Sequence, residues 1–77
     1  MTSQNTAPAV QQQGTHQWVI TVELPGRAME TFYGTYTPPA GATRHDVFLG
    51  IKGDIALKSP DMARANVVFF ALEPNQL

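Results

Sequence analysis

The spacing of apolar residues changes along the chain. Apolar and polar positions alternate over residues 17–24 and again over residues 30–37. Alternation at every second position is typical of strands with one buried and one solvated face. Helical spacing follows over residues 43–58, and an unbroken apolar run comes last, over residues 67–72. The order predicts strand, strand, helix and strand, which is a small α+β domain of the ββαβ type.

The first two segments read as a hairpin. Four apolar side chains of the first strand share one face: Trp18, Ile20, Val22 and Leu24. Pro25-Gly26 suits a tight turn, because proline presets φ and glycine tolerates positive φ. The second strand places Phe32 and Tyr36 on one face. The short connection between the two segments predicts an antiparallel pair.

The third segment has the signals of a capped helix. Thr43 can accept a hydrogen bond from the first turn, and Asp46 lies three residues further on, as in a short capping box. A helical stripe that should face the sheet contains Val47, Phe48, Ile51 and Ile55. Ser59-Pro60 ends the helix, and a connecting loop is expected over residues 61–65.

The closing strand is apolar on both faces. We expect it beside the first strand, in a mainly antiparallel three-stranded sheet of order 2-1-3 with the helix on one face. The favoured assignment places Val68, Phe70 and Leu72 under the helix and leaves Val67 and Phe69 outward; the opposite assignment leaves the other three outward. Either way an apolar surface stays uncovered, and we predict a homodimer through this strand, by edge pairing or by face-to-face stacking.

The length of the chain limits the number of domains and the size of the core. A 77-residue chain has room for one domain, here residues 16–77. A chain of this size buries only about 60% of its unfolded surface, so a partner chain is a plausible source of added stability. Residues 1–15 are mostly polar and are expected to form a flexible tail; the alternative is an arm that orders on a partner.

Charge and hydropathy bear on location and partners. The net charge is −1, and the five basic residues are spread along the chain, which argues against a nucleic-acid binder. A membrane span needs about 20 consecutive apolar residues, and the chain has no such run and no signal-peptide pattern. The absence of cysteine fits a reducing compartment, and a cytoplasmic protein is expected.

The residues that usually carry chemistry do not form a recognisable set. His16 and His45 are far apart, and the neighbours His45 and Asp46 diverge by about 100° on a helix. Neither Ser3 nor Ser59 has a nearby base that could activate it. We therefore expect no enzyme, no metal site and no cofactor.

The segment Gly50-Ile51-Lys52-Gly53 fits the Gly-x-x-Gly pattern that clamps single-stranded nucleic acid in KH modules. A clamp needs the helix to break at these four residues. The favoured interpretation is one helix that tolerates two glycines at about 1 kcal/mol each. Single-stranded nucleic-acid binding is the alternative function.

The glycines also shape the other side of the predicted helix. Leu49, Gly53 and Leu57 fall at i, i+4 and i+8, opposite the core stripe. This small, apolar face is predicted to receive another helix; the alternative is a set of ordinary exposed residues.

Residues 34–39, 43–47 and 66–75 resemble short hypothetical proteins encoded by actinobacteria and their phages. The resemblance covers roughly residues 17–77 and implies a bacterial or phage cytoplasm, without any site residues. The sequence thus predicts a small non-enzymatic interaction or accessory module that self-associates through its last strand.

Overall fold

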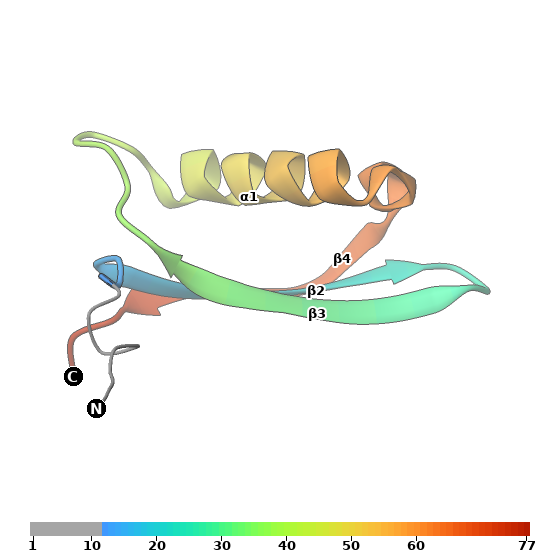
Figure 1. Ribbon diagram of the computed structural model, residues 1–77, viewed down its shortest axis with the longest axis horizontal. Helices are drawn as coiled ribbons and strands as arrows, with labels where there is room; N and C mark the ends of the chain where they lie inside the picture. Colours follow the sequence, from blue (N-terminus) through green and yellow to red (C-terminus); the bar gives the residue numbers. More distant parts are fainter. Residues whose placement is uncertain (1–11) are drawn as a thin grey trace, which may run out of the picture.

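The computed structural model describes residues 12–77, which form one sheet covered by one helix. The elements in chain order are β2 (His16–Leu24), β3 (Ala28–Tyr36), α1 (Arg44–Lys58), the short 3-10 helix η2 (Pro60–Arg64) and β4 (Asn66–Pro74). The three strands are antiparallel in the order β3-β2-β4, and α1 lies across one face of the sheet (Figure 1). The predicted α+β class and strand order are confirmed. Residues 61–64 of the connecting loop expected over residues 61–65 belong to η2 instead.

The β2–β3 hairpin follows from its turn residues. The two strands pair without a break from His16 opposite Tyr36 to Leu24 opposite Ala28. The turn closes with a 3.0 Å hydrogen bond in which the Arg27 N–H donates to the Leu24 carbonyl. Gly26 adopts a φ of +73°, a backbone conformation that residues other than glycine rarely adopt.

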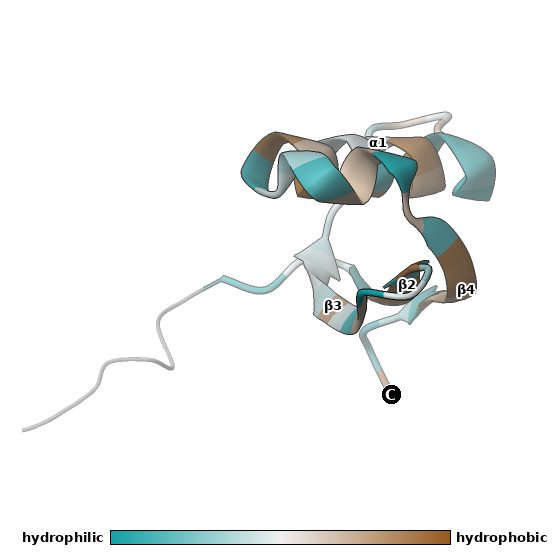
Figure 2. Cartoon of the chain, turned by 90° about the vertical axis from the view of Figure 1, so that its right-hand side faces the viewer, coloured by the Kyte–Doolittle hydropathy of each residue, from teal (hydrophilic) through white to brown (hydrophobic). Residues whose placement is uncertain are grey.

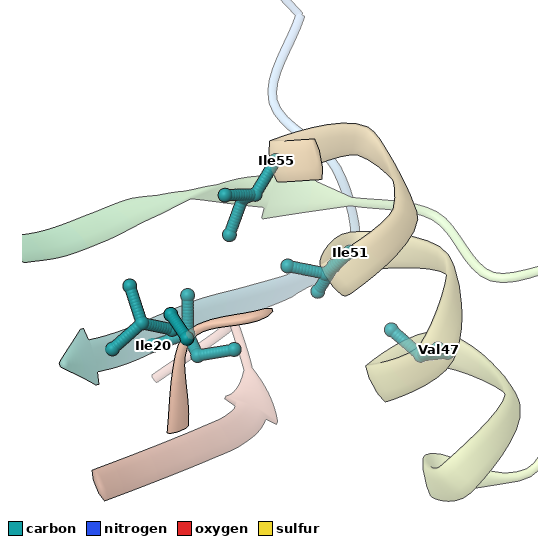
Figure 3. Packing of buried hydrophobic residues seen from close by; sticks show 6 residues of the cluster. Ile20, Val47, Ile51 and Ile55 are labelled. Atoms are coloured by element: carbon teal, nitrogen blue, oxygen red, sulfur yellow. The ribbon is translucent and has the colours of Figure 1, made fainter. Parts of the chain in front are cut away.

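The core lies between α1 and the central strand. Val47, Ile51 and Ile55 project from α1 toward Ile20 of β2, which is fully buried (Figure 3). Val22 and Ala65 complete this buried cluster. The predicted helical stripe is therefore the face that packs on the sheet. The fully buried side chains are aliphatic and come mainly from α1 and the central strand β2. The outer strands β3 and β4 contribute only partly buried side chains.

The cap of α1 is the predicted one. The Asp46 N–H donates to Thr43 Oγ1 at 3.1 Å, and the Thr43 N–H donates to Asp46 Oδ2 at 3.0 Å. Hydrogen bonding from the Thr43 backbone N–H, and then from the Thr43 side chain, holds the pKa of the Asp46 carboxyl below its usual value. At the other end, the Ser59 N–H donates to the Ile55 carbonyl at 2.8 Å.

A β-bulge in β4 changes which side chains face α1. Thr21 lies opposite Phe69 and Val22 lies opposite Val67, so Val68 is an extra residue in the ladder. The bulge shifts the alternation by one position, and Val67 packs against the core cluster. The prediction that Val67 points outward is wrong for this reason.

The other β4 positions follow from the same register. Phe70 and Leu72 pack against the core, as the favoured assignment predicts, and Phe70 meets Phe48 edge to face with ring centroids 5.1 Å apart. Phe69 is outward and 54% exposed. Val68, which was expected under the helix, is 53% exposed.

The folded part begins before His16. The Gly14 N–H donates to Thr35 Oγ1 at 2.9 Å, and the Thr15 N–H donates to Thr37 Oγ1 at 3.1 Å. The Asn75 N–H donates to the Thr15 carbonyl at 2.8 Å. Gly14 and Thr15, which the sequence analysis assigns to the tail, are thus hydrogen-bonded to β3 and to the end of β4, and residues 1–11 of that tail lie outside the described residues.

Candidate interaction surfaces

The sheet face opposite α1, here called the open face, has an apolar centre. Antiparallel pairing aligns Val19 with Tyr33 and Ala71 in one row, and Thr21 with Thr31 and Phe69 in the next. Tyr33 is 75% exposed. Thr21 and Thr31 satisfy each other through a 2.9 Å hydrogen bond between their Oγ1 atoms. The centre of the open face thus offers aromatic and methyl groups with no unpaired charge.

The ends of the open face are more polar. Gln17, Thr35 and Glu73 form the row at one end, and at the other end Glu23 lies between Asn66 and the exposed Met29. None of the three strands carries a lysine or an arginine. An apolar centre with a polar rim is the usual anatomy of a protein–protein interface, whereas phosphate binding requires basic side chains.

The outer face of α1 is exposed as predicted. Leu57 is 82% exposed and Leu49 is 52% exposed, with Gly53 between them. A Cβ atom built at Gly50 or Gly53 would meet no atom of the chain within 4 Å. The packing within the chain therefore gives no reason for a glycine at either position. Figure 2 shows that brown, hydrophobic segments of α1 occur among its hydrophilic ones.

The Gly-x-x-Gly segment does not form a clamp. α1 runs unbroken from Arg44 to Lys58, through Gly50 and Gly53. Ile51 is buried in the core, and Lys52 Nζ lies 5.9 Å from the centroid of the Phe48 ring. The favoured interpretation of one continuous helix is confirmed, and the break that a KH-type loop requires is absent from this helix.

A groove that the sequence did not indicate runs between α1 and β3. Its volume is about 550 Å³. The apolar residues that line it come from α1 (Val47, Ile51, Ile55) and from the sheet (Trp18, Phe32, Tyr36). The Trp18 indole lies against Gly34, at a distance where a Cβ would be 3.0 Å from the ring. Asp54 and Lys58 line the groove from the α1 side.

The groove exists because β3 is poorly covered. No residue of β3 is fully buried, and only Phe32 of this strand packs against the core cluster. A helix of about 10 Å diameter covers roughly two strands spaced about 4.8 Å apart, so one helix leaves part of a three-stranded sheet open. Periodicity within single elements does not report where a helix lies across a sheet, so this groove could not be predicted from the sequence.

The two histidines lie in separate parts of the fold. Thr15 Oγ1 is 2.8 Å from His16 Nδ1, and His45 stacks on Phe48 with ring centroids 6.2 Å apart. Within residues 12–77, no three side chains from His, Cys, Asp and Glu come together as a metal site would require. The single ion pair in this part of the chain joins Arg27 and Asp61 at 3.7 Å, with both side chains mostly exposed.

Comparison with known proteins gives no significant match to a family model, to a curated protein or to a solved structure. Among the described residues, no helix is long and apolar enough to cross a membrane.

Proposed function

We propose that this protein is a small, non-enzymatic protein-interaction module that self-associates through the open face beside β4. One observation carries the proposal: Phe69 is 54% exposed at the centre of an uncharged surface, next to the 53% exposed Val68. A soluble monomer normally keeps large aromatic side chains away from contiguous exposed apolar patches. A second copy of the chain removes this exposure.

The hydrophobic effect favours a dimer through this surface. Complete burial of a fully exposed Phe or Val side chain contributes about 1.5 to 3 kcal/mol, and Phe69 and Val68 are each about half exposed. A two-fold contact buries each residue twice, once from each copy. Phe69 and Val68, with Val19 and Tyr33 around them, supply the apolar surface that favours association.

The bulge favours stacking of two open faces over edge pairing. An extra residue at Val68 interrupts the ladder and increases the twist of β4. Bulges of this kind make an edge strand a poor template for a further strand. Two sheets packed face to face lie about 10 Å apart and interdigitate their side chains, which suits the apolar centre and polar ends described above.

Single-stranded nucleic-acid binding, the alternative from sequence, has no observation in its favour. The continuous α1 provides no loop for a phosphate backbone, and the open face carries Glu23 and Glu73 instead of basic residues. The resemblance to actinobacterial and phage proteins supports placing the module in a bacterial or phage-infected cytoplasm.

Sedimentation velocity over a dilution series tests the proposal. The unmodified chain is expected to sediment above monomer mass, and Phe69→Asp is expected to lower that mass because the charge would have to be desolvated at the contact. Leu77→Asp is the matched control, since Leu77 is fully exposed at the end of the chain. A monomer at all concentrations, or a Phe69→Asp variant with unchanged mass, would refute the open-face contact.

A further inference from the structure

The outer edge of β3 is better suited than that of β4 to accept another strand. Among residues 12–77, β3 pairs only with β2, so the backbone groups on its other side have no strand partner. Monomeric proteins protect such an edge with short strands, bulges, prolines or charged side chains, lysine above all. β3 carries one charge, Glu30; its nine residues pair with β2 in unbroken register and include neither proline nor lysine. β4, in contrast, has a bulge and ends in Pro74.

The β3 sequence is complementary to itself in an antiparallel pair of full length. Such a pair has its two-fold axis at Phe32, the middle residue of Ala28–Tyr36, and the axis fixes every cross-strand partner. Larger side chains then lie opposite smaller ones: Tyr36 opposite Ala28, Tyr33 opposite Thr31, Met29 opposite Thr35 and Glu30 opposite Gly34. Glu30 therefore faces a glycine of the other copy, and the repulsion of two directly opposed carboxylates is avoided.

The charges of the α1/β3 groove have the same property. Asp54 and Lys58 line its α1 side about one helical turn apart, with opposite sign, and both are exposed. α1 and β3 run in opposite directions (Figure 1), so the Lys58 end of the groove lies toward Phe32 and the Val47 end toward Tyr36. The two charged side chains are thus on the part of the groove nearest to the middle of β3.

We propose that β3 pairs with β3 of a second copy across a two-fold axis at Phe32, forming one continuous six-stranded sheet with both α1 helices on the same face. The two grooves merge into one between the helices, floored by Phe32 and Tyr36 of both copies. Asp54 of each copy pairs with Lys58 of the other. A second copy is the occupant because strand register and groove charge are both self-complementary, as an isologous contact requires. Pairing two nine-residue strands forms roughly eight to ten backbone hydrogen bonds.

This contact goes beyond the open-face contact and does not rest on it, because it uses the edge of the sheet. Phe69→Asp blocks the open face and leaves β3 and the groove unchanged, so the tests are done in the full chain with this change. We expect Phe69→Asp to be a dimer by sedimentation equilibrium. A monomeric Phe69→Asp variant would overturn the β3 contact while supporting the open-face contact.

Charge reversal in the Phe69→Asp chain tests the groove. Asp54→Lys gives both charged positions positive sign in both copies, and Lys58→Glu gives both negative sign. Each change should raise the dissociation constant about tenfold or more, since attraction becomes repulsion. An equal mixture of the two variants should recover the affinity, because every charge again faces one of opposite sign.

Lys52→Glu is the matched control, since it reverses a charge of α1 outside the groove and should leave the affinity unchanged. Asp54 and Lys58 are exposed in the single chain, so each variant should keep the same circular dichroism spectrum. Unchanged affinity in both reversals, or no recovery on mixing, would overturn the proposed pairing.

Amide exchange gives a second readout at the strand itself. In a single copy, the β3 N–H groups that do not bond to β2 point outward and exchange as exposed amides, whereas the pair protects them. Their protection should rise with concentration in the Phe69→Asp chain and fall when Asp54→Lys is added. Protection that is complete in dilute protein, or that never appears at these amides, would overturn the β3 contact.

Discussion

The two edge strands, β3 and β4, differ in which of their faces is left uncovered. β4 sends Val67, Phe70 and Leu72 into the core, and its apolar exposure is on the open face. β3 is exposed on both faces: Met29, Thr31, Tyr33 and Thr35 lie on its open face, and its α1 side is incompletely covered at the groove. One helix on a three-stranded sheet therefore leaves two apolar surfaces, one on each side. The position of α1 across the sheet decides which strand is exposed on which side.

Adjacent phenylalanines in β4 give the sharpest test of this comparison. Phe70→Ala should lower the free energy of unfolding by about 3 kcal/mol, near the lower end for a core phenylalanine, because its ring packs on Phe48. Phe69→Ala should cost less than about 1 kcal/mol in dilute protein, where the open face is solvated in both states. Urea unfolding of both variants measures the difference. Equal losses of unfolding free energy in the two variants would contradict the assignment of Phe70 to the core and Phe69 to the open face.

The floor of the groove is tested at Gly34 of β3. A Cβ at this position would lie 3.0 to 3.3 Å from atoms of the Trp18 indole, so Gly34→Val must displace the ring. We expect a loss of about 1 to 3 kcal/mol, as for overpacking elsewhere, together with a shifted Trp18 emission maximum. Gly26→Val is unsuitable as a control because of its positive φ, whereas Thr31→Val on the open face of β3 changes volume little and should leave the emission unchanged.

The cap of α1 fixes where the helix starts over the sheet. Thr43→Ala removes the hydroxyl that accepts from the Asp46 N–H and should cost about 1 kcal/mol by thermal or urea unfolding. Thr43→Ser keeps a hydroxyl acceptor at the same place and should therefore retain most of the stability that Thr43→Ala loses. Failure of serine to rescue the variant would mean that the cap bond is not the cause.

Gly50→Ala should have the opposite sign. The new methyl group meets nothing within 4 Å and removes backbone freedom from the unfolded chain, so dilute protein should gain about 0.5 to 1 kcal/mol of stability. A destabilised Gly50→Ala monomer would reveal a packing role for this glycine inside the chain.

The smallest expected effect is on the stability of the fold at acid pH. The Thr43 backbone N–H, and then its hydroxyl, hold the pKa of Asp46 below the usual value in the folded state. A lowered carboxyl pKa contributes stability above the usual aspartate value of about 3.9, and that contribution is lost as pH falls toward the folded-state pKa. The acid side of the stability profile should therefore be flatter in Asp46→Asn than in the unmodified chain. Identical profiles would contradict the assigned cap.

The sequence predicted the elements well because their signals are local. The alternation over residues 17–24 marks the buried face of β2, and Thr43 with Asp46 marks the start of α1. Two features depend on relations between elements and were not predictable. The bulge at Val68 arises from pairing with β2, and it reversed the assignment of Val67. The groove arises from the placement of α1 across the sheet.

The central proposal is that copies of the chain meet at the open face, which the single helix leaves uncovered. Isotope-filtered NMR on a mixture of labelled and unlabelled chains reports contacts between copies directly. The account predicts contacts from Phe69 and Val68 to Val19 and Tyr33 of the other copy. A complete absence of contacts between copies at high concentration, or contacts that do not involve the open face, would contradict it.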